Sequence, residues 1–396
     1  MTLVTEKLLA AAREELPRAV ALRRRIHANP ELGLDLPETT AAVLESLADL
    51  DLEVTRSRRT SGVFARLRGG KPGPTVLLRA DMDALPMPED TGLPFASKNS
   101  GRMHACGHDA HTAMLAGAVR LLERRRAALA GEVLFMFQPG EEGFAGAKLM
   151  LEEGLIDPSS VSRAFAIHID PRIPLGRVAS RAGALLASAD GFEIRLTGRG
   201  GHASMPHDTV DPVPVACEIV TAIQSFVTRR IDAFDPVVIT VTKIAAGTTG
   251  NVIPESVEML GTIRATSARA RERAHTGLRR VVEGIAAAHD VKANLAIGMG
   301  YPVTVNDADA AHFSREVARD VLGEDAYIAM PQPVMGAEDF SYVLERIPGA
   351  MLFLGVRPDD VAQPAPCHSN RMLLNEEGMV AGMALHAGLA LRALAG

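Results

Sequence analysis

Cysteine is scarce in this chain, with three residues among 396. An odd number of cysteines, spread along the sequence, argues against a disulfide framework and indicates a reducing compartment. Long apolar runs are lacking as well. The first twenty residues carry charges throughout, so they hold no signal-peptide core, and no uninterrupted apolar run of about 18 residues follows. We therefore expect a cytoplasmic protein that does not cross a membrane.

Basic blocks and nucleotide-binding motifs are also lacking. The formal net charge is −6, and the short arginine run 124–126 ends a predicted helix, where cations are favourable anyway. This distribution leaves no electrostatic footprint for nucleic acid. Because the sequence contains no Gly-x-Gly-x-x-Gly phosphate loop, a nucleotide-dependent enzyme is also disfavoured.

The remaining composition, 47% hydrophobic and 23% charged, is that of an ordinary globular protein. A chain of this length predicts two or three domains and a large core.

One stretch, residues 103–111, concentrates metal-binding side chains. It holds His104, Cys106, His108, Asp109 and His111. A thiolate two residues before an imidazole can reach the same zinc-like ion if the glycine between them permits a tight loop, and the aspartate could orient a ligand imidazole. We expect this cluster on a loop that enters a helix at Thr112. The alternative, surface histidines around a small core cysteine, would leave the density of these groups unexplained.

Two aspartates follow a predicted buried strand, 75–80. Asp81 and Asp83 lie where open α/β sheets place their ligand crevice. Alone, they could simply form a capped loop. Next to the cysteine and histidine cluster, we expect them to support metal ligands.

Two adjacent glutamates, Glu141 and Glu142, follow the period-free apolar run 132–138, which indicates a strand buried on both faces. Such a pair can divide the work, because one carboxylate can bind metal while the other accepts a proton from water. The alternative is two solvated loop charges. His168 directly follows another apolar run, 163–167, and we expect it to be a metal ligand rather than a structural histidine.

The order of predicted elements changes twice along the chain. Residues 185–301 follow the order βαββαβ, which is the split βαβ or ferredoxin-like arrangement, and this segment interrupts an α/β pattern. The expected helices are 5–28, 36–50, 112–127, 210–231, 268–289, 307–321 and one from 375, and the expected strands are 62–67, 75–80, 132–138, 163–167, 190–197, 236–245, 257–265, 291–299 and 350–354.

Seven motifs together resemble one enzyme family. They occupy residues 81–86, 103–111, 138–142, 168, 200–203, 250–254 and 336–340, and so span nearly the whole chain. The pattern is similar to that of the metal-dependent amidohydrolases that include hippurate hydrolase, N-acetyldiaminopimelate deacetylase and plant auxin-conjugate hydrolases. That group is a branch of the aminoacylase and carboxypeptidase G2 superfamily of metallopeptidases.

The resemblance implies a fold. Residues 1–184 and 302–396 would form an α/β catalytic domain with a mixed sheet flanked by helices. Residues 185–301 would form an inserted ferredoxin-like βαββαβ satellite that acts as a lid and through which a homodimer often forms.

The resemblance also implies a metal site. Matched position by position, the ligands are Cys106, His108, Glu142, His168 and His368, with Asp81, Asp83 and Asp109 in support. Five ligands suit two divalent ions better than one. A cysteine stands where the wider superfamily has a bridging aspartate, so zinc, manganese, cobalt and nickel all stay open. Cys367, beside His368, is outside the family motif, and is either incidental or in contact with the site.

The reaction implied by the resemblance is hydrolysis of an N-acyl amino acid or related small amide. Glu141 would accept a proton from a water that the metal pair activates, and pass it to the leaving amine. His202 would stabilise the oxyanion, in some members from the other subunit. Asn251, Arg264 and the Gly336 loop would hold the substrate carboxylate.

Two other functions stay open. A dipeptidase or aminopeptidase of the same fold would need acidic groups to hold a free substrate amine. A metal-binding regulator that has lost catalysis would not need Glu141 and His202, which are both present. Among single residues, Arg264 could instead be a surface strand residue, and His202 a structural histidine.

Overall fold

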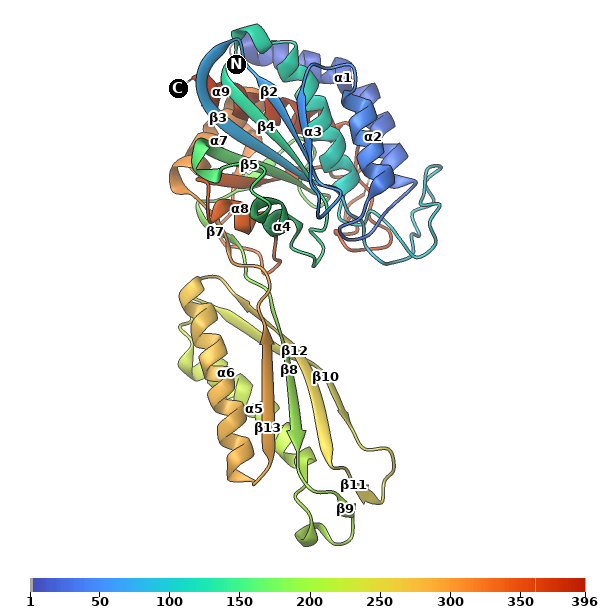
Figure 1. Cartoon of the computed structure of the whole chain (residues 1–396), viewed down its shortest axis with the longest axis vertical. Coiled ribbons are helices and arrows are strands. Elements are labelled where there is room, and N and C mark those ends of the chain that lie inside the picture. Colours follow the sequence, from blue (N-terminus) through green and yellow to red (C-terminus); the bar gives the residue numbers. More distant parts are fainter. Residues whose placement is uncertain (1–2, 360, 396) are drawn as a thin grey trace. The chain divides into compact units, whose positions relative to one another are not determined.

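The structure, a computed structural model, describes residues 3–359 and 361–395, with side chains from residue 7 onward. The chain divides into two units (Figure 1). The first unit contains the chain up to Leu185, Val305–Gln332 and the chain from Asp339 on. The second unit contains Leu186–Thr304 and Pro333–Glu338.

An eight-stranded mixed sheet forms the centre of the first unit (Figure 1). Its strands lie in the order β1-β2-β4-β3-β5-β16-β6-β15. Their bounds are β1 Glu53–Arg56, β2 Val63–Arg68, β3 Lys71–Asp81, β4 Ala130–Gln138, β5 Val161–Asp170, β6 Val178–Ser180, β15 Tyr327–Ala329 and β16 Gly349–Gly355. Helices flank this sheet, so the predicted α/β class and mixed sheet are confirmed.

The middle of this sheet is parallel. Strand β3 pairs in parallel with β4 and β5, and β5 pairs in parallel with β16. Because parallel strands end at the same edge of a sheet, the residues that follow β3, β4 and β5 are brought together. Residues 133–138 of β4 are all buried, as the period-free apolar run predicts.

Helices pack around the sheet. Those of the first unit are α1 Leu3–His27, α2 Pro37–Leu47, α3 His108–Glu123, α4 Gly146–Glu152, α7 Ala308–Leu322, α8 Ser341–Leu344 and α9 Gly378–Ala395, with short 3-10 turns at Arg126–Ala128, Pro158–Ser160 and Glu324–Ala326. Pro37 opens α2, where its missing N–H costs nothing. Asp307 caps α7, because its side chain accepts a hydrogen bond of 2.9 Å from the Ala310 N–H.

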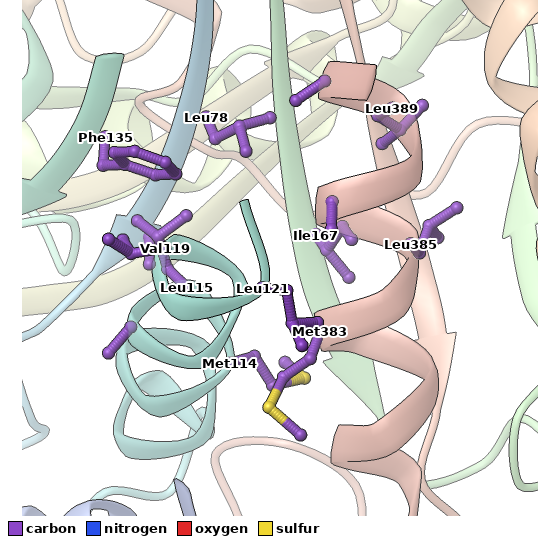
Figure 2. Close-up of a cluster of buried hydrophobic side chains, with 14 of the residues drawn as sticks. Leu78, Met114, Leu115, Val119, Leu121, Phe135, Ile167, Met383, Leu385 and Leu389 are labelled. Atoms are coloured by element: carbon purple, nitrogen blue, oxygen red, sulfur yellow. The ribbon is translucent and has the colours of Figure 1, made fainter. Parts of the chain in front are cut away.

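Apolar side chains of α3 and α9 pack on the strands of the sheet (Figure 2). Figure 2 labels Leu78, Met114, Leu115, Val119, Leu121, Phe135, Ile167, Met383, Leu385 and Leu389. Two glycines let the helices approach one another. A Cβ at Gly117 of α3 would overlap Sδ of Met383, and a Cβ at Gly382 of α9 would overlap Sδ of Met114. This reciprocal packing fixes α3, whose first residue is His108.

Among the described residues, α9 is the helix whose length and hydropathy would also suit a membrane span. However, 78% of it is buried inside the protein. Its apolar character is therefore that of a core helix.

The second unit contains an antiparallel sheet with two long helices. In chain order its main elements are β8 Asp190–Thr197, α5 Pro212–Arg230, β10 Val237–Ala246, β12 Ser256–Ala265, α6 Ala268–Ala288 and β13 Lys292–Gly298. The strands pair in the order β10-β12-β8-β13. Phe192, Ile194 and Leu196 alternate into the core of this unit along β8, as their spacing predicts.

Short elements complete the chain. The strands β9 Gly201–His202 and β11 Val252–Ile253 pair with each other, and a 3-10 turn spans Pro206–Asp208. The strands β7 Gly183–Leu186 and β14 Thr304–Asn306 lie at two of the four places where the chain passes between the units, and the other two places are Gln332–Pro333 and Glu338–Asp339.

The expected start of one helix is wrong. α3 begins at His108 rather than at Thr112, so His108, Asp109 and His111 belong to its first turn instead of a loop. Gly107 makes the early start possible, because its left-handed φ of 81° turns the chain directly into the helix. The apolar periodicity begins only at Thr112 and hid this turn.

Candidate metal centre

The loop before α3 lies tightly against β5 at Gly107. A Cβ at this left-handed position would lie 2.5 Å from Cγ1 of Ile169, so only glycine allows the approach. As a result, Cys106 and His108, on either side of the glycine, lie next to His168 of β5. The Sγ of Cys106 is 3.3 Å from Nε2 of His168.

His168 presents a defined ring nitrogen to Cys106. Its Nδ1 lies 2.6 Å from the carbonyl oxygen of Ile169, so Nδ1 carries the proton and donates it. The lone pair is therefore on Nε2, the nitrogen that faces Cys106. This is the tautomer that a metal-binding imidazole needs.

His108 is buried among carboxylates. Its Nε2 lies 3.6 Å from Oδ2 of Asp81 and 3.9 Å from Oε1 of Glu142, and its Nδ1 lies 3.5 Å from Oδ1 of Asp83. Within the described residues, neither ring nitrogen has a hydrogen-bond partner. Burial lowers the pKa of His108, but the carboxylates, Asp81 foremost, outweigh it and raise the pKa to about 10. Such surroundings favour a cation.

Asp83 fixes the backbone of the two adjacent glutamates. Its Oδ1 accepts the Glu141 N–H at 2.9 Å, and its Oδ2 accepts the Glu142 N–H at 3.0 Å. Both carboxylate oxygens of Asp83 therefore hold the loop that follows β4. Held in this way, Glu141 and Glu142 each place a carboxylate oxygen within 4.8 Å of a nitrogen of His108 and of one another.

Glu142 also meets a residue from the far end of the chain. Its Oε1 lies 3.2 Å from Nε2 of His368. Burial raises the pKa of Glu142, but His368 and His108 outweigh it and lower the pKa, so this side chain stays a carboxylate. The backbone of His368 has a φ of 69°, which residues other than glycine rarely adopt. Backbone strain of this kind concentrates at functional sites.

His111, to which the sequence analysis assigns no specific role, orients other groups. Its Nδ1 donates to Oδ1 of Asp81 at 2.6 Å, and its Nε2 accepts the Ile169 N–H at 2.8 Å. Both nitrogens are thus occupied, so His111 cannot be a metal ligand. Burial lowers its pKa to about 4, although Asp81 opposes this, and the ring stays neutral. His111 is three residues after His108 and therefore lies on the same helix face, and this spacing indicates a position beside the metal ligands.

A buried arginine on β3, Arg79, was not foreseen. It donates to Oδ2 of Asp81 at 2.7 Å, to Oε1 of Gln138 at 2.7 Å and to Oδ1 of Asp339 at 2.9 Å. Burial raises the pKa of Asp81, but Arg79 and the neighbouring imidazoles outweigh it and hold that pKa well below its usual range. In the sequence, Arg79 is a single charged residue near the end of an apolar strand, and such a residue indicates a buried charge that needs partners.

Asp109 turns toward α1 instead of toward a predicted ligand. Its Oδ2 lies 2.8 Å from Nδ1 of His27 and 3.0 Å from Nε of Arg23. Nε2 of His27 lies 3.1 Å from Oε1 of Glu89. His104 is buried beside this group, with its ring centroid 6.2 Å from that of His27. These contacts tie the first turn of α3 to α1.

The His27 contacts predict how stability depends on pH. Burial lowers the pKa of His27, but Asp109 and Glu89 outweigh it and raise the pKa from 6.5 to about 9. A raised folded-state pKa stabilises the protein fully below the unfolded value, and the contribution is lost as pH rises through the folded value. We expect the free energy of unfolding to fall by roughly 3 kcal/mol between pH 6.5 and 9.

Urea denaturation at several pH values across that interval measures this fall, with His27→Gln as the matched variant. The variant cannot take up the proton, so its stability should change less over the same interval. An equally steep decline in His27→Gln would show that another group is responsible.

The predicted metal ligands thus come together in the first unit. Among the described residues, five sets of possible donor atoms lie within 4.8 Å of one another, and three of them consist of the predicted ligands and Glu141: Cys106 with His108 and His168, Cys106 with Glu142 and His368, and His108 with Glu141 and Glu142. The thiol of Cys106 is shared by two sets, as a bridging ligand would be. Thiolate, imidazole and carboxylate donors suit zinc, manganese, cobalt or nickel.

Two residues predicted from the resemblance meet in the second unit. Strands β9 and β11 pair His202 with Val252, and the carbonyl oxygen of Asn251 accepts the Ala203 N–H at 3.1 Å. His202 is exposed, and its Nδ1 accepts the Ser204 N–H at 3.1 Å.

The other two predicted residues lie elsewhere in the same unit. Arg264 is half-buried on β12, where burial lowers its pKa against the opposing charge of Asp190. Gly336 lies in the segment Pro333–Glu338.

Comparisons with known proteins point to one family. The family model for peptidase family M20/M25/M40 matches residues 77–392. The chain is 41% identical over 397 residues to the IAA-amino acid hydrolase ILR1-like 2 of Arabidopsis thaliana, covering 99% of this chain and 89% of the relative. It is 39% identical over 374 residues to an N-acetylcysteine deacetylase of Bacillus subtilis (strain 168), covering 94% and 96%.

A solved structure is similar as well. It is a Bacillus subtilis protein described as a dinuclear metal binding peptidase from the M20 family. The TM-score is 0.84 at 35% sequence identity, and the match covers 97% of this chain and 99% of that one.

Proposed function

The chain belongs to peptidase family M20/M25/M40. We propose that it hydrolyses the amide bond of N-acyl amino acids. Membership makes it a metal-dependent hydrolase of amide or peptide bonds. The observation that carries the proposal is the convergence of cysteine, histidine and glutamate donors beside a second glutamate at the ends of β3, β4 and β5.

We propose that two divalent metal ions are held by Cys106, His108, Glu142, His168 and His368. The donor chemistry fits these ions. The buried His108 imidazole has no hydrogen-bond partner among the described residues, and its donor atom lies within 4.8 Å of the Cys106 thiol in one set and of the Glu142 carboxylate in another. When bound, the ions supply Lewis acidity that lowers the pKa of water and polarises the substrate carbonyl. His111 and Asp83 hold this arrangement in place through the contacts described above.

Glu141 is the proposed general base. Its neighbour Glu142 is paired with His368, so Glu141 is the carboxylate assigned to proton transfer. It is buried, and its backbone N–H is held by Asp83 at 2.9 Å. In this role Glu141 accepts a proton from the attacking water and delivers it to the leaving amine.

His202 is the proposed oxyanion donor. Because its Nδ1 accepts the Ser204 N–H, a neutral His202 carries its proton on Nε2 and can donate from there. We expect His202→Ala to lower kcat by about 10²–10³, the usual loss for one oxyanion donor, with metal content unchanged. Steady-state kinetics and metal analysis test this, and an unaffected kcat would remove His202 from the mechanism.

The substrate class is supported by the names of two relatives, an IAA-amino acid hydrolase and an N-acetylcysteine deacetylase. We propose that Arg264, Asn251 and the Gly336 loop hold the substrate carboxylate. A guanidinium and backbone N–H groups are suitable partners for such a group.

A substrate panel tests this function. N-acyl amino acids should be hydrolysed faster than dipeptides, and only after divalent metal is restored to chelated protein. The matched substrate is the methyl ester of each N-acyl amino acid, which should lose most of its kcat/KM because it has no carboxylate. Equal rates for acid and ester would contradict the proposed carboxylate recognition.

The alternative is a dipeptidase or aminopeptidase of the same fold, which the solved relative described as a peptidase supports. In that case the same panel would show a preference for dipeptides with a free amine.

We further propose that the second unit is the ferredoxin-like satellite and pairs two copies of the chain. Its strand β10 is at the edge of the sheet and exposes Val238 and Ile244. Light scattering should give twice the mass of one chain. Mixing His202→Ala with Glu141→Gln subunits should restore part of the activity if one copy completes the other's site.

A further inference from the structure

Two of the three cysteines meet at the candidate metal centre. The His368 N–H donates to the carbonyl oxygen of Ala105 at 2.8 Å. This hydrogen bond joins the peptide group between Ala105 and Cys106 to the peptide group between Cys367 and His368. Cys106 and Cys367 therefore each contribute their Cα atom to one of two peptide groups that are hydrogen-bonded to each other.

This backbone arrangement suits a disulfide. A backbone hydrogen bond holds neighbouring β-strands about 4.8 Å apart, and a single such bond brings two loop segments to a similar separation. A disulfide joins Cα atoms that are roughly 4.4–6.8 Å apart. The hydrogen bond between the adjoining peptide groups therefore points to a separation of the two Cα atoms that an S–S bond can span.

The side chains also point to the same place. Sγ of Cys106 lies 3.3 Å from Nε2 of His168, and Sγ of Cys367 lies 3.8 Å from the carbonyl oxygen of Ile169, the next residue of β5. Among the causes that raise the pKa of the Cys106 thiol, its neighbour Cys367 is the foremost, followed by burial. The third cysteine, Cys217, is exposed on α5 in the second unit.

We propose that Cys106 and Cys367 are a modification site, a dithiol that peroxides oxidise to a disulfide. The reaction needs hydrogen peroxide or an organic hydroperoxide as the oxidant. One cysteine, as the thiolate, attacks a peroxide oxygen, breaks the O–O bond and becomes a sulfenic acid. The other thiol attacks that sulfur, forms the S–S bond and releases the sulfenic oxygen as water. Two thiols are oxidised, and the peroxide takes up two electrons and two protons.

The modification would act on metal binding. In a disulfide, the sulfur of Cys106 has no thiolate charge and is no longer a ligand of the kind that metals select. This consequence rests on the proposed role of Cys106 as a shared ligand, whereas formation of the bond does not. Because a disulfide is reversed by thiols and sulfinic acid is not, Cys367 would also protect Cys106 from permanent oxidation.

Mass spectrometry of the full-length, metal-free protein tests the proposal. After limited hydrogen peroxide and alkylation, the Cys217→Ser chain should lose two hydrogens and carry no alkyl group, and its digest should contain a peptide pair joined through Cys106 and Cys367. Cys367→Ser is the matched variant, and it should instead gain oxygen on Cys106. Two alkylated thiols in treated Cys217→Ser, or oxygen gained on Cys106 without a joined pair, would overturn the proposal.

Zinc binding to the reduced and oxidised Cys217→Ser chain gives the second measurement. We expect binding to fall at least tenfold on oxidation and to return after dithiothreitol. If the disulfide forms but zinc binding is unchanged, the modification site stands and the proposed ligand role of Cys106 fails. If zinc binds the reduced chain but no disulfide forms, the proposed function stands and this inference fails.

Discussion

Glu141→Gln should lower kcat by about 10²–10⁴ or more while the protein keeps its metal. Glutamine preserves the shape of the side chain and removes its ability to accept a proton. The loop should remain in place, because Asp83 holds Glu141 through the backbone N–H at 2.9 Å and not through the side chain. Turnover of an N-acyl amino acid, measured together with metal content, gives both quantities on one preparation.

Glu142→Gln is the matched control, since it makes the same isosteric change one residue later. The Glu142 carboxylate lies 3.2 Å from Nε2 of His368 and belongs to two sets of candidate donors. This variant should therefore lose metal as well as activity. If Glu141→Gln lost metal while Glu142→Gln kept it and stayed active, the two assignments would be reversed.

Much of the site was predictable because its residues follow buried strands. The apolar run predicted at 132–138 covers most of β4, and the run at 75–80 lies within β3, one residue before its end. Both runs are recognisable without knowledge of their partners, since strands buried on both faces are continuously apolar. The parallel pairing of β3 with β4 and β5 then brings Asp81, Glu141 and His168 to one edge.

The supporting contacts were not predictable because their partners are distant in the sequence. Arg79 and Asp339 are 260 residues apart, and no local pattern links them. His27 and Asp109 are 82 residues apart and meet only because α1 packs on α3. Strands β6 and β15 have three residues each, too few to show a period, and they form through pairing with neighbours.

Cys106→Ala should remove most bound metal and lower activity by about 10³ or more. Its thiol is shared by the set with His108 and His168 and the set with Glu142 and His368, so its loss weakens both. Metal ions contribute several kcal/mol to such reactions, and each 1.36 kcal/mol is tenfold in rate. Emission spectrometry of the reconstituted protein should give about two ions per chain for wild type and far less for the variant.

Three variants show whether the sharing is real. His168→Ala and His368→Ala each remove a donor from only one of the two sets that contain Cys106, so each should retain about one ion per chain. Cys217→Ser removes an exposed thiol on α5 and should retain both ions. A Cys106→Ala protein with metal content equal to that of His168→Ala would mean that Cys106 serves one ion. Activity that survived exhaustive chelation in the wild type would refute the metal centre itself, because Glu141 would then act without the Lewis acid that makes water acidic enough to lose a proton at neutral pH.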